Sequence, residues 1–179
     1  MNWKTNAVRA PYIYADPLDR YIYALKFRNE RRIGRALGLL LAEAVHEHRR
    51  DIDAVVPVPL HPSRLHERGY NQALEIARSL SFELRLPILR AGIYRSAATP
   101  PQTRLRAESR RENLRFAFEV HRDLSGCRLA IVDDVITTGA TVNGLAGKLR
   151  EAGAAYMEAW AIARTPRSSE GTGLPPGRH

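Results

Sequence analysis

The sequence predicts an α/β domain with a mostly parallel sheet flanked by helices. Short apolar runs rich in β-branched residues, such as 54–56 and 129–132, alternate with longer stretches whose apolar positions recur at helical spacing. This strand–helix–strand order is typical of parallel sheets joined by right-handed crossovers. Ligands of such folds bind beyond the carboxyl ends of the strands, so polar residues that follow a strand are the first candidates for a site.

Composition narrows the class of protein further. The 179 residues suffice for one domain with a hydrophobic core. No apolar run reaches the roughly 20 residues that span a bilayer, and no secretory signal is visible, so we expect a cytoplasmic protein without membrane insertion. The net charge of +9 favours anionic partners, either phosphorylated metabolites or nucleic acid. The single cysteine, Cys127, cannot form an internal disulfide or, alone, a zinc site.

The beginning of the chain is expected to be helical after an irregular start at residues 1–15. Asp16 and Pro17 have the pattern of an N-cap followed by proline at the first helical position, which predicts a helix to about Phe27. A second helix is expected over about 32–48. Its buried stripe is predicted to comprise Leu37, Leu40, Leu41, Ala44 and Val45.

A basic segment follows the short strand predicted over 54–56. Arg64 and Arg68 are four residues apart, so on a helical turn they face the same way, and Gly69 permits a positive φ. Paired arginines after a strand end favour a phosphate or pyrophosphate clamp. The alternative is a solvated basic turn that leads into the amphipathic helix expected over 73–84.

The middle of the chain gives weaker signals. Short strands are predicted over 87–89 and 93–95, and two adjacent prolines make 96–106 a loop. A short arginine-rich helix is predicted over 105–114. The alternating apolar pattern of 116–120 predicts another strand.

The strongest functional signal lies in residues 129–141. A buried strand is expected to end at Val132, so that Asp133 and Asp134 lie at its end, before a threonine-rich turn that opens a helix over 142–152. The unpaired N–H groups of a helix start favour an anion, and carboxylates can accept hydrogen bonds from sugar hydroxyls or hold Mg²⁺ through water. The alternative is an ordinary strand–helix unit with polar cap residues.

The end of the chain completes the division into three parts. A last strand is expected over 156–163, and the Pro/Gly/Ser-rich residues after it are expected to be disordered. We therefore expect an N-terminal helical segment that packs on the core at residues 1–50, the α/β domain at 51–164 and a disordered tail at 165–179.

The segment from Val132 to Thr141 resembles the phosphoribosyl-pyrophosphate (PRPP) motif of type I phosphoribosyltransferases. In that family the acidic pair contacts the ribose 2′- and 3′-hydroxyls, and the turn binds the 5′-phosphate. The resemblance therefore implies that Asp133 and Asp134 are the catalytic residues. It implies a phosphate site formed by Val135, Ile136, Thr137, Thr138, Gly139, Ala140 and Thr141.

Four stretches, spread over about residues 20–164, resemble the ComF/GntX-like phosphoribosyltransferase-domain proteins. They are Tyr23 to Phe27; Val56 to Leu60 with Arg64, Arg68, Gly69, Asn71 and Gln72; Gln102 with Arg110, Asn113 and Phe118; and the Asp133–Asp134 motif through to Arg164. The resemblance implies a type I phosphoribosyltransferase fold with a mobile loop over the site. Typical members carry an N-terminal zinc ribbon with four cysteines. Because Cys127 is the only cysteine in this sequence, the resemblance does not imply a zinc site here.

The implied function is Mg²⁺-assisted transfer of the phosphoribosyl group of PRPP, with release of pyrophosphate. Mg²⁺ would be held through PRPP and not by direct protein ligands. The pyrophosphate side would comprise Arg64, Arg68 and Gly69, and the mobile loop would supply Gln102, Arg104 and Arg110. The acceptor base, and whether there is turnover at all, stay open.

The alternative is a ComF-like protein of DNA uptake and transformation that interacts with single-stranded DNA and binds PRPP only as a regulatory ligand. The partners to be expected are then nucleic acid, a second copy of the chain or a component of the competence machinery. The candidate DNA patch consists of Arg104, Arg106, Arg110, Arg111 and Arg115, with Tyr70 and Tyr94 as stacking residues.

Overall fold

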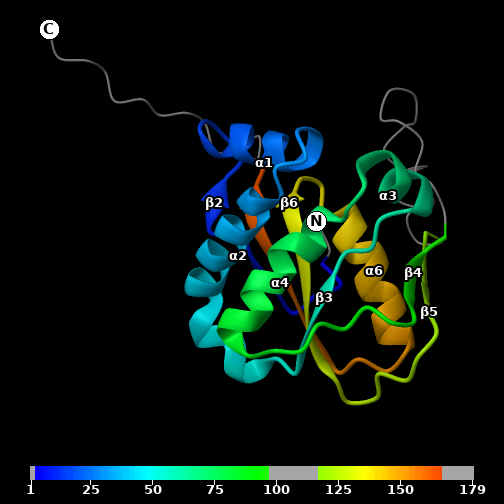
Figure 1. The fold of residues 1–179 in the computed structure, drawn as a ribbon. Helices are drawn as coiled ribbons and strands as arrows, with labels where there is room; N and C mark the ends of the chain where they lie inside the picture. Colours follow the sequence, from blue (N-terminus) through cyan, green and yellow to red (C-terminus); the bar gives the residue numbers. More distant parts are fainter. Residues whose placement is uncertain (1–2, 97–116, 167–179) are drawn as a thin grey trace, which may run out of the picture.

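A five-stranded parallel sheet forms the centre of the computed structural model, which describes residues 3–96 and 117–166 (Figure 1). The strand order is β1-β7-β6-β3, and β2 pairs with β7 next to β1. The strands are β1 (Ala7–Arg9), β2 (Tyr12–Ile13), β3 (Ala54–Pro57), β6 (Arg128–Ile136) and β7 (Tyr156–Arg164). Every described ladder of this sheet is parallel, so the predicted α/β class is confirmed.

Helices cover both faces of the sheet. They are α1 (Leu18–Phe27), α2 (Arg31–Val45), the 3-10 helix η1 (His46–Asp51), α3 (Pro62–Arg68), α4 (Gln72–Leu84) and α6 (Ala140–Glu151). Apolar side chains of α1, α2 and α4 pack with Ala130 and Val132 of β6, whereas those of α6 pack with Leu129 and Ile131. Because side chains alternate along a strand, Ala130 and Val132 lie on the face that α1, α2 and α4 cover, whereas Leu129 and Ile131 lie on the face that α6 covers.

A small antiparallel sheet lies on the α6 side. It consists of β4 (Ile93–Arg95) and β5 (Phe118–Val120), and Arg95 is opposite Phe118 in its register. Ile93 and Phe118 are buried in the same core cluster as α6. The predicted strand at 93–95 is thus present, and residues 118–120 of the one predicted over 116–120 form β5, but both lie outside the central sheet. The stretch predicted as a strand at 87–89 makes a single parallel bridge, from Ile88 to Val55.

The expectation that residues 1–15 are irregular is wrong for β1 and β2. Ala7 pairs with Glu158 and Tyr12 pairs with Ala163, both on β7 at the other end of the chain. Strands of three and two residues are too short to show a period of two, and their pairing partner is distant in sequence. Local patterns therefore carry no signal for them.

The start of α1 also differs from the prediction. Pro17 occupies the N-cap, where no side chain caps the helix. Asp16, which was expected at that position, instead forms an ion pair with Arg20, with Oδ1 and Nε 2.5 Å apart. The carboxylate thus interacts with a side chain in the first turn of the helix and not with its backbone.

Helix α2 packs closely on α4 through two buried glycines, Gly34 and Gly38. A Cβ atom at Gly38 would lie 2.4 Å from the backbone oxygen of Ile76. This glycine face sets the rotation of α2, so the predicted burial of Leu40 and Ala44 is wrong and both are exposed.

We expect Gly38→Ala to lower the free energy of unfolding by about 1–3 kcal/mol, because the added methyl group must displace backbone of α4. Gly147→Ala in α6 is the matched control. There the new Cβ meets only the flexible end of Lys4, and alanine favours a helix by about 0.5–1 kcal/mol. Urea denaturation of both variants measures the difference, and equal effects would contradict close packing at Gly38.

Candidate functional site

The last residues of β6 carry two adjacent carboxylates. The predicted end of this strand at Val132 is wrong, because β7 pairs with β6 as far as Ile136, opposite Arg164. Asp133 and Asp134 therefore lie within the strand. Neighbouring strand residues point to opposite faces, so Asp134 lies on the α1 side and Asp133 on the α6 side.

Asp134 interacts with cations from α1 and α3. Its Oδ2 is 2.9 Å from Nζ of Lys26, in the last turn of α1, and its side chain is only 10% exposed. The Oδ1 atom accepts the backbone N–H of Val135 at 2.7 Å. Burial lowers the pKa of Arg68, whereas the nearby Asp134 carboxylate opposes this shift. Asp134 is thus a carboxylate held between two helices.

Asp133 faces the small antiparallel sheet. Burial raises the pKa of Asp133 to about 7, and the charge of Asp134 adds to this increase, whereas Lys26 and Arg95 oppose it. Burial likewise lowers the pKa of Arg95 on β4, where Asp133 opposes the shift and Arg64 adds to it. The charge of Arg95 thus acts on Asp133, and Arg64 is close enough to Arg95 for their charges to interact.

Helix α3 places the paired arginines at this end of the sheet. The side chain of His61 caps the helix and accepts the N–H of Ser63 at 3.2 Å, and Gly69 ends it with a φ of 79°. Arg64 and Arg68 both lie on this helix, and Arg68 is close enough to Asp134 for their charges to interact. Figure 1 shows α1 and α3 on either side of the end of β6.

Other residues of the same basic segment have structural roles. Asn71 accepts the N–H of Leu74 at 3.3 Å and donates to the oxygen of Val58 at 2.9 Å, so it caps α4 and ties it to the chain after β3. Gln72 is buried. Asn71 thus ties the N-terminus of α4 to the chain after β3.

The threonine-rich turn leads directly from β6 into α6. Gly139 lies at the N-cap with a φ of 65°, in the left-handed region that glycine adopts without strain. The helix begins at Ala140, two residues before its predicted start, and the Ala140 N–H donates to Oγ1 of Thr138 at 3.4 Å. Thr137 and Thr138 are exposed. The N-terminus of α6 thus lies just after the carboxylate pair.

This arrangement suits a polyanion that also carries hydroxyl groups. Among the described residues, Lys26, Arg68 and Arg95 interact with the two carboxylates, and Arg64 lies close to Arg68 and Arg95. The cations and the helix N-terminus attract phosphates, and the carboxylates accept hydrogen bonds from hydroxyls. Within residues 3–96 and 117–166, no three or more His, Cys, Asp or Glu lie together in a way that could hold a metal ion.

Two of these cations were missed from the sequence. Lys26 lies in a stretch that resembles the ComF-like proteins, but no role was assigned to it. Arg95 belongs to a weakly predicted strand, and only the pairing of β4 with β5 brings it towards Asp133. A lysine in the last turn of a helix is a local signal, whereas the position of Arg95 depends on tertiary structure.

Several predicted residues are not placed at the site. The loop residues Gln102, Arg104 and Arg110, like the rest of the proposed arginine patch, lie outside the described residues. The expectation that Tyr70 stacks on a base is wrong, because its side chain is 4% exposed and its hydroxyl donates to the oxygen of Leu25. Tyr94 is 55% exposed on β4.

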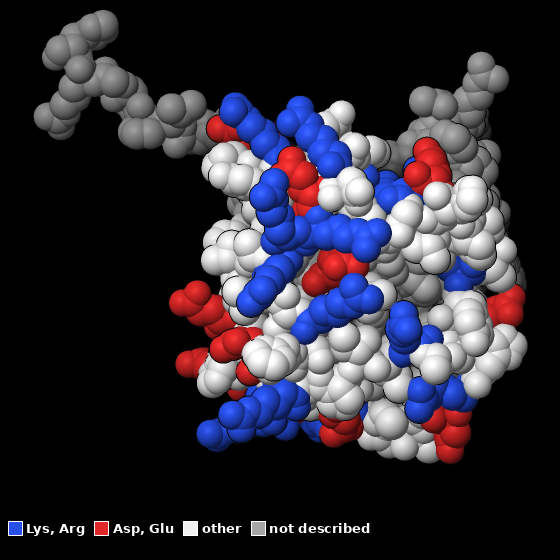
Figure 2. Space-filling view, in the orientation of Figure 1, with Lys and Arg blue, Asp and Glu red and all other residues white. Residues whose placement is uncertain are grey.

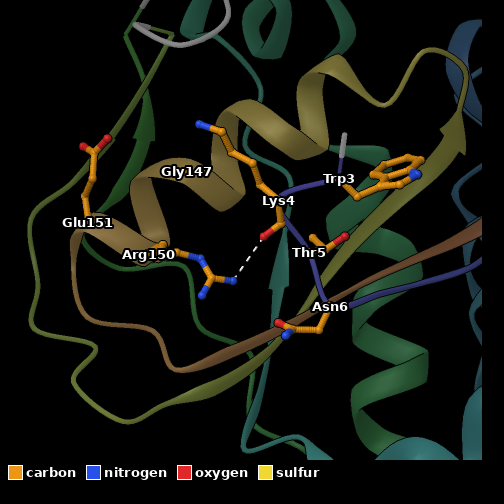
Figure 3. Close-up of a pocket in the computed structure, with 7 residues that line it drawn as sticks. All are labelled: Trp3, Lys4, Thr5, Asn6, Gly147, Arg150 and Glu151. Atoms are coloured by element: carbon orange, nitrogen blue, oxygen red, sulfur yellow. Dashed lines mark hydrogen bonds between the residues drawn. The ribbon is translucent and has the colours of Figure 1, made fainter. Parts of the chain in front are cut away.

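A separate open pocket of about 540 Å³ lies between the N-terminal segment and the C-terminal half of α6 (Figure 3). It is lined by Trp3, Lys4, Thr5, Asn6, Gly147, Arg150 and Glu151. Nη2 of Arg150 donates to the oxygen of Lys4 at 3.2 Å, and Lys4 N–H donates to Oδ1 of Asn143 at 2.9 Å. These contacts fasten the N-terminal segment to α6.

Comparison with known proteins shows the family. No protein-family model matches the chain. Competence protein F of Haemophilus influenzae is 38% identical over 159 residues, which cover 84% of this chain and 69% of that protein. The chain belongs to the ComF family. DNA utilization protein YhgH of Escherichia coli K12 is also 38% identical to this ComF-family chain. The matched region covers 85% of this chain and 69% of YhgH. The resemblance to ComF-like proteins is thus confirmed.

More distant likenesses complete the comparison. Competence protein ComFC of Bacillus subtilis is 28% identical to this ComF-family chain. The matched region covers 88% of this chain and 64% of ComFC. Among solved structures, a purine phosphoribosyltransferase from Pyrococcus horikoshii has a TM-score of 0.44 and 20% identity, covering 73% of this chain and 81% of that one. A PRPP amidotransferase from B. subtilis has a TM-score of 0.48 and 22% identity over 72% and 26% of the two chains. At such scores the likeness is too slight to indicate a shared activity.

The shifted pKa of Asp133 predicts how stability depends on pH. The folded chain keeps a proton on Asp133 up to about pH 7, whereas an ordinary aspartate releases it near pH 3.8. Stability is therefore expected to fall as the pH rises from about 4 to 7. Asp133→Asn should flatten this fall and make the variant more stable than wild type at pH 8, as measured by thermal unfolding across the pH range.

Asp123 is the matched control, because hydrogen bonds from Ser125 lower its pKa. Its carboxylate supports folding at pH values above its ordinary pKa, so Asp123→Asn should not stabilise the chain at pH 8. Parallel pH profiles for wild type and Asp133→Asn would show that Asp133 ionises normally.

Proposed function

We propose that this chain binds PRPP at the carboxyl end of β6 and transfers its phosphoribosyl group to an acceptor. The observation that carries this proposal is the pair of carboxylates on opposite faces of β6, enclosed by cations from α1, α3 and β4. The adjoining helix N-terminus supplies a separate position for a phosphate. PRPP has the matching chemistry, with vicinal hydroxyls between a monophosphate and a pyrophosphate.

Each end of PRPP has its own binding groups in this proposal. Asp133 and Asp134 accept hydrogen bonds from the ribose hydroxyls. The turn from Thr137 to Thr141 and the first N–H groups of α6 bind the 5′-phosphate. Arg64 and Arg68 bind the pyrophosphate, since a guanidinium donates two parallel hydrogen bonds to phosphate oxygens. Mg²⁺ that accompanies PRPP would neutralise part of the pyrophosphate charge.

The reaction is a displacement at C1′ of the ribose. The acceptor forms a bond to C1′ as the bond from C1′ to the pyrophosphate oxygen breaks, and the electron pair leaves with pyrophosphate. No protein nucleophile is needed for this step. The side chains would act by holding the ribose in position and by stabilising the negative charge that develops on the leaving group.

Isothermal titration with PRPP and Mg²⁺ tests the proposal. At pH 8, above the raised pKa of Asp133, we expect Asp134→Asn and Asp133→Asn each to weaken PRPP binding by about 10- to 100-fold, because each removes a charged acceptor for a ribose hydroxyl. Asp123→Asn, an exposed aspartate in the turn before β6, should leave the affinity unchanged. Wild type without affinity for PRPP would refute the proposal, and binding without pyrophosphate release for any base in a panel would leave PRPP as a regulatory ligand.

A second candidate function is the binding of single-stranded DNA. Two observations favour it: the relatives are named competence and DNA utilization proteins, and Lys and Arg side chains gather over the upper part of one face (Figure 2). A positive surface binds the phosphate backbone without reading its sequence. In this alternative the cations that surround Asp134 would contact DNA phosphates, and PRPP would regulate that contact.

Fluorescence anisotropy with labelled oligothymidylate tests this alternative. If Arg64 and Arg68 contact phosphates, the logarithm of the affinity should fall linearly with the logarithm of salt concentration, and each substitution by alanine should reduce the slope by about 0.7. Arg50→Ala, in η1 at the opposite end of β3, serves as the control. Binding that is absent or insensitive to salt would remove this candidate.

A further inference from the structure

Two aromatic side chains on α1 are exposed beside the carboxylate pair. Tyr23 is 52% exposed and Phe27 is 62% exposed. They are four residues apart on the helix, and their ring centres are 4.9 Å apart with an angle of 43° between the planes. Single exposed apolar residues are common, but two aromatic rings in contact beside a polar site indicate a surface for a partner.

An arginine lies over each of these rings. The guanidinium carbon of Arg28 is 5.8 Å from the ring centre of Tyr23, and that of Arg68 is 5.4 Å from the ring centre of Phe27. Guanidinium groups are planar and stack on aromatic faces. Because Arg68 belongs to α3, the stacked groups extend from α1 to α3. Figure 2 shows Lys and Arg side chains gathered in the upper part of the molecule, where Figure 1 places α1.

Two cations, Lys26 and Arg68, link the stacking surface to the proposed ribose site. Phe27 follows Lys26, whose ammonium is 2.9 Å from Asp134. Arg68, which stacks on Phe27, is also close enough to Asp134 to interact with its charge. A planar group that approaches a ribose held by the carboxylates therefore has flat apolar and guanidinium surfaces next to it.

We propose that Tyr23 and Phe27 form the binding surface for the acceptor of the phosphoribosyl group, and that this acceptor is an aromatic nucleobase. The inference rests on the proposed function, because the ribose at Asp133 and Asp134 sets where the base must lie. Aromatic rings stack on any base, and a purine has more surface to stack than a pyrimidine. Two rings in contact offer one stacking position, whereas polynucleotide grooves stack successive bases along a track.

Isothermal titration of the full chain with three probes tests the inference: PRPP, ribose 5-phosphate and adenosine 5′-monophosphate, each with Mg²⁺. Wild type should bind the mononucleotide more tightly than ribose 5-phosphate, which lacks the base. Phe27→Ala should weaken mononucleotide binding by about 5- to 150-fold and affect ribose 5-phosphate less. Phe27→Trp should retain the affinity for the mononucleotide.

Phe82→Ala is the matched control, because Phe82 is 83% exposed near the far end of α4. It should leave all three affinities unchanged. If PRPP does not bind to wild type, the proposed function itself fails. If PRPP binds but Phe27→Ala weakens the mononucleotide and ribose 5-phosphate equally, or neither, only the stacking inference is overturned. A Phe27→Ala variant that loses oligothymidylate binding and keeps mononucleotide binding would also overturn it.

Discussion

The alternation of side chains along β6 is the constraint on which the site depends. Asp133 and Asp134 are neighbours in the chain, yet the pleat of the strand directs them to opposite faces of the sheet. Each carboxylate therefore meets a different group of elements: α1 with Lys26 on one face, and β4 with Arg95 on the other. Pairing of β6 on both sides, with β3 and β7, keeps this division fixed.

Burial and the surrounding charges together set the protonation of the carboxylate pair. Burial and mutual repulsion favour the protonated form of Asp133, and Lys26 and Arg95 oppose this effect only in part. The described cations in turn repel each other, as the effect of Arg64 on Arg68 and Arg95 shows. The phosphates of a ligand would relieve the repulsion among the cations, and its hydroxyl groups would donate hydrogen bonds to the carboxylates, which supports the proposed binding of such a ligand.

Residues with local signals were predicted well, and residues positioned by distant pairing were not. The strand–acid–threonine order of 129–141 and the spacing of Arg64 and Arg68 were visible in the sequence, because they depend on neighbours along the chain. The continuation of β6 through the carboxylates depends on β7, and the position of Arg95 depends on β5. The exposure of Leu40 depends on the close approach of Gly38 to Ile76. None of these contacts produces a periodic pattern of apolar residues in the segment that makes it.

The pairing of β1 and β2 with β7 has a consequence for synthesis on the ribosome. Strands β1 and β2 are synthesised first, but they pair with β7, which is synthesised last. They can therefore join the sheet only after residues 156–164 have been made. Helix α1, which follows them directly and carries Lys26, belongs to the same hydrophobic cluster as Trp160 and Ile162 of that last strand. A nascent chain that stops short of β7 thus has its acidic pair but no anchored lysine beside it. The candidate site is therefore complete only when nearly the whole domain has been translated.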